Sequence, residues 1–111
     1  METDLIKVLQ KKGVNIPNPE SVFISDEVDP DRISANGVTI HGGCKIFGQT
    51  TLIMDHAVIG YEAPVTLENT QVGKNTHLKG GYFKGAVFAG DNIFGSGAHV
   101  REGTILEEQA N

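Results

Sequence analysis

The sequence predicts an all-β protein that folds as a parallel β-helix, and three observations support this class. Large apolar residues return every six or seven positions from residue 37 onward. A small residue usually stands two positions before each of them, and a glycine often follows. The 14 glycines and the aromatic content of only 6% also indicate frequent turns.

The large residues of this repeat fall into two blocks. They are Phe47, Ile53, Ile59, Val65, Val72 and Leu78 in the first, and Phe88, Phe94, Val100 and Leu106 in the second. Residues two positions apart in a strand point to the same face, so each large residue and the small residue before it should point inward. Six residues leave room only for a short strand and a corner. The count slips at residues 79–84, where we interpret Tyr82 and Phe83 as a loop that touches a neighbouring subunit.

One such unit cannot be stable alone. Burying one aliphatic side chain contributes about 1.5–3 kcal/mol, whereas ordering six residues costs on the order of 9 kcal/mol. Stacked neighbours must supply the difference through shared ladder hydrogen bonds and buried faces. The alternative all-β fold is an antiparallel sandwich, whose turns would come at less even intervals than these.

We expect two parts, an N-terminal helix in residues 1–13 and a β-helix domain in residues 14–111. Thr3 can cap the helix and Gly13 can end it. The helix is short and marginal alone, so its Leu and Ile face must dock on the rest of the chain. Three prolines within residues 14–36 leave only the segment SVFIS as a short strand there.

Composition and charge exclude several classes of partner. The net charge is −5 and the nine basic residues are scattered, which argues against nucleic acid and anionic membranes. No apolar run approaches the ~20 residues that cross a bilayer, and a signal-peptide core is lacking at the N-terminus. The single cysteine, Cys44, rules out an internal disulfide, suits a reducing compartment and is interpreted as a packed or corner thiol. We therefore expect a cytoplasmic protein.

The segments VIGYEA, QVGKNT, IFGSGA and HVREGT resemble the left-handed β-helix of hexapeptide-repeat transferases, in which three hexapeptides form one triangular coil. This resemblance implies a left-handed stack of about five triangular coils over residues 14–111. The segment KKGVNIPNPESVFISDEV resembles the junction before the β-helix of bifunctional N-acetylglucosamine-1-phosphate uridyltransferase/glucosamine-1-phosphate acetyltransferases (UDP-N-acetylglucosamine pyrophosphorylases). The segment GAHVREGTILEE resembles that family's AHLRPGT segment. Proteins of this kind are usually trimers, so the resemblance implies a homotrimer.

The same resemblance implies a β-helix segment of a sugar-nucleotide transferase, serving as a scaffold for oligomerisation and for sugar-phosphate binding. The family's nucleotidyltransferase chemistry belongs to a separate glycine-rich α/β domain, and no phosphate loop occurs in this sequence. The acetyltransferase histidine of the family lies on later coils. We therefore expect this chain alone to be inactive and to need no cofactor.

Arg101 matches the arginine of the family's LRPG segment, which implies contact with a sugar phosphate or a sugar nucleotide. A guanidinium group can bind phosphate in a bidentate manner. The alternative is a solvated arginine that pairs with Glu102 or with a neighbouring strand.

Two other functions remain open. A free-standing acyltransferase would use acetyl-CoA or another acyl-CoA in the groove between trimer subunits, with His77 or His99 as general base. Each histidine precedes an inward residue and should point outward, and a bulged loop at residues 79–84 would place them one coil apart. A purely structural trimerisation module is the other function. We expect no metal site, because the four histidines are 15, 21 and 22 positions apart and lack a close pair.

Overall fold

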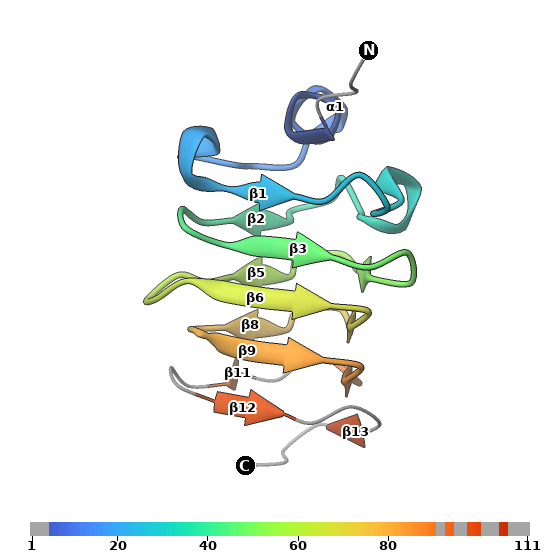
Figure 1. The fold of residues 1–111 in the computed structure, drawn as a ribbon, viewed down its shortest axis with the longest axis vertical. Coiled ribbons are helices and arrows are strands. Elements are labelled where there is room, and N and C mark those ends of the chain that lie inside the picture. Colours follow the sequence, from blue (N-terminus) through green and yellow to red (C-terminus); the bar gives the residue numbers. More distant parts are fainter. Residues whose placement is uncertain (1–4, 91–92, 95–97, 101–104, 107–111) are drawn as a thin grey trace.

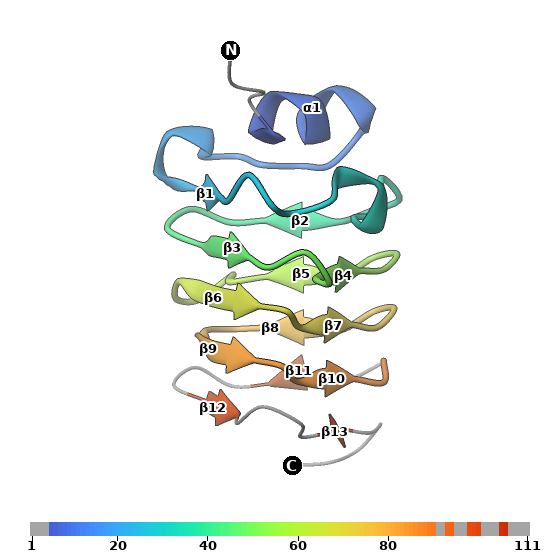
Figure 2. The same cartoon turned by 45° about the vertical axis from the view of Figure 1, so that its right-hand side comes forward.

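The computed structural model describes residues 5–90 and, for the backbone alone, three strands at 93–94, 98–100 and 105–106. Parallel strands stack in successive coils below a short N-terminal helix (Figures 1 and 2). The chain with its N-terminal helix measures 41 by 23 by 21 Å along its principal axes. The predicted parallel β-helix is confirmed.

Three parallel sheets form the three sides of the stack. The first sheet has the order β1 (Phe23–Ile24), β3 (Lys45–Phe47), β6 (Val65–Glu68), β9 (Gly81–Lys84) and β12 (Ala98–Val100). The second sheet has the order β4 (Leu52–Ile53), β7 (Gln71–Val72), β10 (Val87–Phe88) and β13 (Ile105–Leu106). The third sheet has the order β2 (Thr39–Ile40), β5 (Val58–Ile59), β8 (His77–Leu78) and β11 (Ile93–Phe94).

The coil is left-handed. In Figure 2 strands β3, β6 and β9 run to the right on the near side, strands β2 and β5 run to the left behind them, and each coil lies further from the N-terminus. The first sheet has five strands, and the second and third sheets have four each. Because a full coil takes one strand from each sheet, the stack has fewer complete coils than the predicted five. Isolated bridges from Asn15 to Thr39 and from Ile33 to Ile53 extend these two sheets at the N-terminal end.

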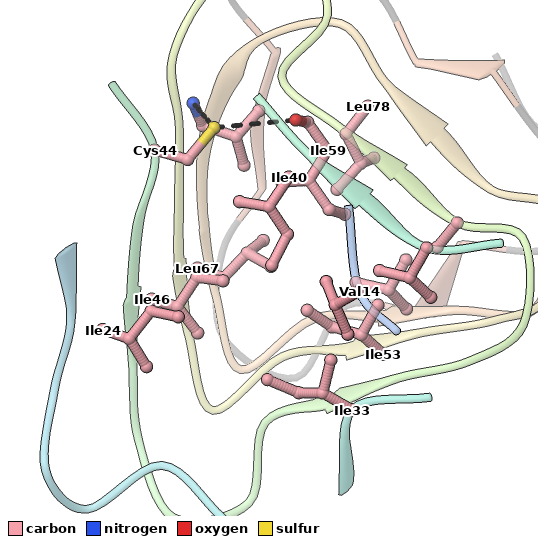
Figure 3. Close-up of a cluster of buried hydrophobic side chains, with 14 of the residues drawn as sticks. Val14, Ile24, Ile33, Ile40, Cys44, Ile46, Ile53, Ile59, Leu67 and Leu78 are labelled. Carbon is pink, nitrogen blue, oxygen red and sulfur yellow. Dashed lines mark hydrogen bonds between the residues drawn. The ribbon is translucent and has the colours of Figure 1, made fainter. Parts of the chain in front are cut away.

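Each side of the stack buries one column of large apolar side chains. The columns are Ile24, Ile46, Leu67 and Phe83 in the first sheet, Ile33, Ile53, Val72 and Phe88 in the second, and Ile40, Ile59 and Leu78 in the third. Figure 3 shows side chains from all three sides meeting in the middle of the coils. Every inner coil therefore packs its apolar residues against the coils above and below it.

Small residues occupy the corners between strands, as the sequence predicts. Thr51, Thr70 and Thr76 are fully buried there. The hydroxyl of Thr51 donates to the Phe47 carbonyl at 2.6 Å, and that of Thr70 lies 3.1 Å from the Phe83 carbonyl. The two buried hydroxyls thus bond to carbonyls of strand residues, and the Phe47 carbonyl also accepts from the Asn69 amide at 3.2 Å.

The first sheet departs from the predicted register. Ile46 is the large inward residue of β3, whereas Phe47, which the sequence places inside, is only partly buried. Val65 is buried as predicted, but Leu67 supplies the large side chain of β6. Ile46 pairs with Leu67, 21 positions later, and Leu67 pairs with Phe83, 16 positions later. Because the coils differ in length, a fixed six-residue period assigns the wrong inward residue in this sheet.

The predicted loop at residues 79–84 is wrong. Residues 81–84 form strand β9, because the backbone there completes a ladder with β6. Phe83 points inward and packs edge to face against Phe88, with ring centroids 5.1 Å apart. Tyr82 points outward and is 37% exposed.

Helix α1 (Leu5–Lys12) covers the N-terminal end of the stack, close to its predicted bounds. Leu9 is fully buried against the first coil, and the amides of Gly13 and Val14 both donate to the Leu9 carbonyl. Two short 3-10 turns follow, η1 (Pro19–Ser21) and η2 (Pro30–Arg32). No helix in the described part of the chain has the length and apolar character to span a bilayer.

Candidate functional site

His77 lies on the outer surface of the third sheet. Its neighbour Leu78 points into the stack, so the alternation of strand β8 turns the imidazole outward, as the sequence predicts. The Tyr61 ring meets the His77 ring edge to face, with centroids 6.2 Å apart. Backbone pairing with Val58 on one side and Ile93 on the other fixes the position of this residue.

Tyr61 reaches His77 because a loop of residues 60–64 folds against the next coil. The amides of Glu62 and Ala63 both donate to the Lys79 carbonyl, at 3.1 and 2.7 Å. Gly60 allows the loop to start, because its φ of 79° is unfavourable for other residues and an added Cβ would lie 2.4 Å from the Cys44 sulfur.

Lys79 completes a group of four side chains that we call the corner cluster: Tyr61, Glu62, His77 and Lys79. The Lys79 Nζ lies 5.9 Å from the centroid of the Tyr61 ring and 3.6 Å from Glu62 Oε2. The ion pair is partly solvated, with side chains 32% and 51% exposed, so it contributes little to stability. The cluster therefore offers a cation, an aromatic face and an imidazole at the solvent surface.

The surroundings of His77 meet only part of what a catalytic base requires. An efficient histidine base is usually oriented by a partner that fixes one tautomer. The contact with the edge of Tyr61 restrains the ring but supplies no carboxylate for this purpose. The arrangement suits binding better than proton transfer.

The structure does not bring His77 and His99 together. His99 belongs to β12 of the first sheet, where its backbone pairs with Tyr82, whereas His77 belongs to the third sheet. The interpretation that they lie one coil apart is wrong, because residues 81–84 form a strand and not a bulged loop. The side chain of His99 and the whole of Arg101 lie outside the described residues.

Cys44 is a packed corner thiol, as the sequence predicts. It is fully buried, and its sulfur lies 3.6 Å from the Ile59 carbonyl and 3.5 Å from the Val65 amide nitrogen (Figure 3). Burial raises the pKa of the Cys44 thiol, and this effect exceeds the lowering caused by the hydrogen bond from Val65. A buried thiol of this kind is a poor nucleophile.

Within the described residues, histidine, cysteine, aspartate and glutamate side chains form no group of three or more that could hold a metal ion. His41 and His56 both lie among these residues, and His56 adopts a positive φ of 63° at its corner.

Sequence reasoning missed Tyr61, Glu62 and Lys79 as neighbours of His77. The available signal was the segment YEAP at residues 61–64, which adds residues between two strands of the repeat. Extra residues at a corner of a regular stack form a loop, and such loops often carry binding residues.

Comparisons of the chain with protein-family models, with curated proteins and with solved structures gave no match. The fold and the corner cluster therefore provide the structural basis for a functional proposal.

Proposed function

We propose that the chain is the β-helix scaffold of a sugar-nucleotide transferase resembling UDP-N-acetylglucosamine pyrophosphorylases, and that it assembles cytoplasmic homotrimers and helps to bind a sugar phosphate. The observation that carries this proposal is the filled interior of the stack. Columns of buried isoleucine, leucine, valine and phenylalanine occupy it from Val14 to Phe88. Partners and ligands must therefore bind to the outer faces, where flat sheets offer rigid surfaces for assembly.

Arg101 is the proposed sugar-phosphate ligand. By sequence it directly follows strand β12 of the first sheet. A guanidinium group matches the oxygens of a phosphate, and in a chain of net charge −5 a local cation is needed to attract an anion.

The test is calorimetric titration of the chain with glucosamine-1-phosphate. We expect saturable binding that weakens at least about tenfold in Arg101→Ala, since hydrogen bonds to charged groups contribute about 1.5–3 kcal/mol. Lys45→Ala is the matched control, because it removes one positive charge from the same sheet and should leave the affinity nearly unchanged. Equal affinities of the wild type and Arg101→Ala would refute the role of Arg101.

The corner cluster favours one alternative, an acyl-CoA-dependent acyltransferase that acts in the groove between subunits. His77 would serve as base, and Lys79 lies two positions further along, where a cation would attract a coenzyme A phosphate. Titration with acetyl-CoA separates the two functions. Saturable binding with acyl transfer that disappears in His77→Asn supports the acyltransferase, and assembly without either ligand supports a purely structural module.

A further inference from the structure

Asn36 and Gly37 form an exposed Asn-Gly pair at the corner between the second and third sheets. The bridge of Ile33 in the second sheet precedes the pair, and strand β2 of the third sheet follows it. Asparagine is one of the chemically labile residues. The backbone nitrogen of a following glycine can attack its side-chain amide, because glycine has no side chain to crowd that nitrogen. The pair is therefore a candidate site of chemical modification.

The Gly37 amide is not held by the backbone ladder. Gly37, His56 and Asn75 occupy the same position in successive coils, with φ values of 70°, 63° and 58°. The His56 amide donates to the Asn36 carbonyl in the coil before it, at 2.8 Å. The Asn75 amide donates in the same way to the Asp55 carbonyl, at 3.0 Å. Gly37 lies in the first coil of this column, and none of the described residues accepts a hydrogen bond from its amide.

The fold itself requires glycine at position 37. The φ of 70° is unfavourable for a residue with a side chain, and an added Cβ would lie 2.2 Å from the His56 Nδ1. The geometry of the corner thus places the least hindered kind of backbone nitrogen directly after Asn36. The nucleophile and the labile amide are both exposed, so water can reach them.

The Asn36 side chain faces Asp55 of the next coil. Its hydrogen bond is one of the causes that lower the pKa of Asp55, and the charge of Lys74 is another. The Asn36 backbone amide donates to the Ser34 hydroxyl at 3.0 Å. A carboxylate in place of the Asn36 amide would lie beside the ionised Asp55, and neighbouring like charges repel.

We propose that Asn36 is a site of spontaneous deamidation in the folded chain, and that this modification loosens the N-terminal end of the stack as the protein ages. The Gly37 nitrogen attacks Asn36 Cγ, so that a new bond from carbon to nitrogen forms and the bond from Cγ to Nδ2 breaks. Nδ2 leaves as ammonia and carries the proton that the Gly37 nitrogen loses. The product is a cyclic succinimide, and water opens either of its carbonyls to give aspartate or isoaspartate. The inference does not depend on the proposed sugar-phosphate function.

Both products disturb this corner. Each adds a carboxylate beside Asp55. Isoaspartate also adds a carbon atom to the backbone between Asn36 and Gly37, whereas the ladder contacts at Ile33 and Thr39 hold the chain on both sides of the pair. The extra atom must therefore displace the corner or break one of these contacts.

The test is incubation of the full chain at mildly alkaline pH, with and without urea, followed by peptide mapping with mass spectrometry. We expect the folded chain to lose ammonia at Asn36, so that the peptide gains the mass that separates a carboxylic acid from an amide. An isoaspartate-specific methyltransferase should label the same peptide. Asn75 is the internal control, because it is exposed but precedes Thr76, whose branched side chain crowds the amide nitrogen. Asn36 that stays intact in the folded chain but reacts in urea would overturn the proposal, because the fold would then protect it.

Urea unfolding of fresh and aged samples tests the consequence. The midpoint of the aged wild type should shift to lower urea concentration, whereas Asn36→Gln should show no shift with age, because a longer side chain forms the cyclic product far less readily. Asn36→Asp, which carries the charge of one product from the start, should unfold at lower urea than the fresh wild type at neutral pH. Equal shifts with age in the wild type and Asn36→Gln would overturn the proposed loosening, and so would an unchanged midpoint in Asn36→Asp and in the fully deamidated wild type.

Discussion

Asp55 fixes the corner between the second and third sheets through a network of short polar side chains. The Ser34 hydroxyl donates to Asp55 Oδ1 at 2.5 Å and accepts a hydrogen bond from the Asn36 amide at 3.0 Å. The hydrogen bond from Ser34 is the largest cause of the lowered pKa of Asp55; desolvation opposes it, and the charges of Lys74 and His56 add to it. The ionised carboxylate therefore stabilises the folded state.

This network predicts a pH-dependent stability difference. A pKa below the ordinary value of 3.8 in the folded state means that the stabilisation is fully present above pH 3.8 and is lost as the pH falls through the lower folded value. Ser34→Ala removes the main cause of that shift. We expect Ser34→Ala to lower the free energy of unfolding at neutral pH. The difference in this free energy between the variant and the wild type should shrink as the pH falls below 3.8.

Urea unfolding at several pH values measures this effect. Ser21→Ala is the matched control, because the Ser21 hydroxyl accepts from the Gly43 amide at 2.9 Å and donates to the Asn18 carbonyl at 3.1 Å, without a carboxylate partner. The difference in free energy of unfolding between Ser21→Ala and the wild type should not change with pH. If the difference in free energy of unfolding between Ser34→Ala and the wild type is also independent of pH, the hydrogen bond from Ser34 does not lower the pKa of Asp55.

At the scale of single elements, the sequence predicts the strands of the second and third sheets well. Ile53, Ile59, Val72, Leu78 and Phe88 are all buried as expected. These strands are two residues long and begin directly after a small corner residue, so alternation leaves only one choice of inward side chain.

The strands of the first sheet could not be predicted from a fixed period. Strand β6 has four residues and β9 has four, and each presents two candidates for the large inward position. The inward position of Leu67 depends on its pairing with Ile46, 21 positions earlier, and that of Phe83 on its pairing with Leu67, 16 positions earlier. Long-range pairing of this kind leaves no local signal in the sequence.

The corner cluster was predictable only in part. Strand alternation is enough to turn His77 outward, because Leu78 is the better core residue. The contact with Tyr61 depends on backbone hydrogen bonds from a loop to Lys79 in the next coil, and side-chain types do not reveal such bonds. The outward histidine could thus be predicted, but its surroundings could not.

At the scale of the whole molecule, stability is expected to be a sum over stacked coils. Each inner coil contributes its buried columns to two neighbours, so damage in one coil affects the adjacent ones as well. Helix α1 covers the N-terminal end, where its Leu9 is buried and its Lys12 Nζ donates to the Pro30 carbonyl at 2.7 Å. This cover shields the open strand edges of the first coil from other chains.

The free energy of unfolding of Ile59→Ala and Val58→Ala tests the central geometric claim most directly. Ile59 is fully buried in the middle of the third sheet, whereas Val58, the preceding residue of the same strand, faces outward. Urea unfolding should give a loss of about 2–5 kcal/mol for Ile59→Ala and less than about 1 kcal/mol for Val58→Ala. Equal losses, or a larger loss for Val58→Ala, would contradict the stacked coil and its register.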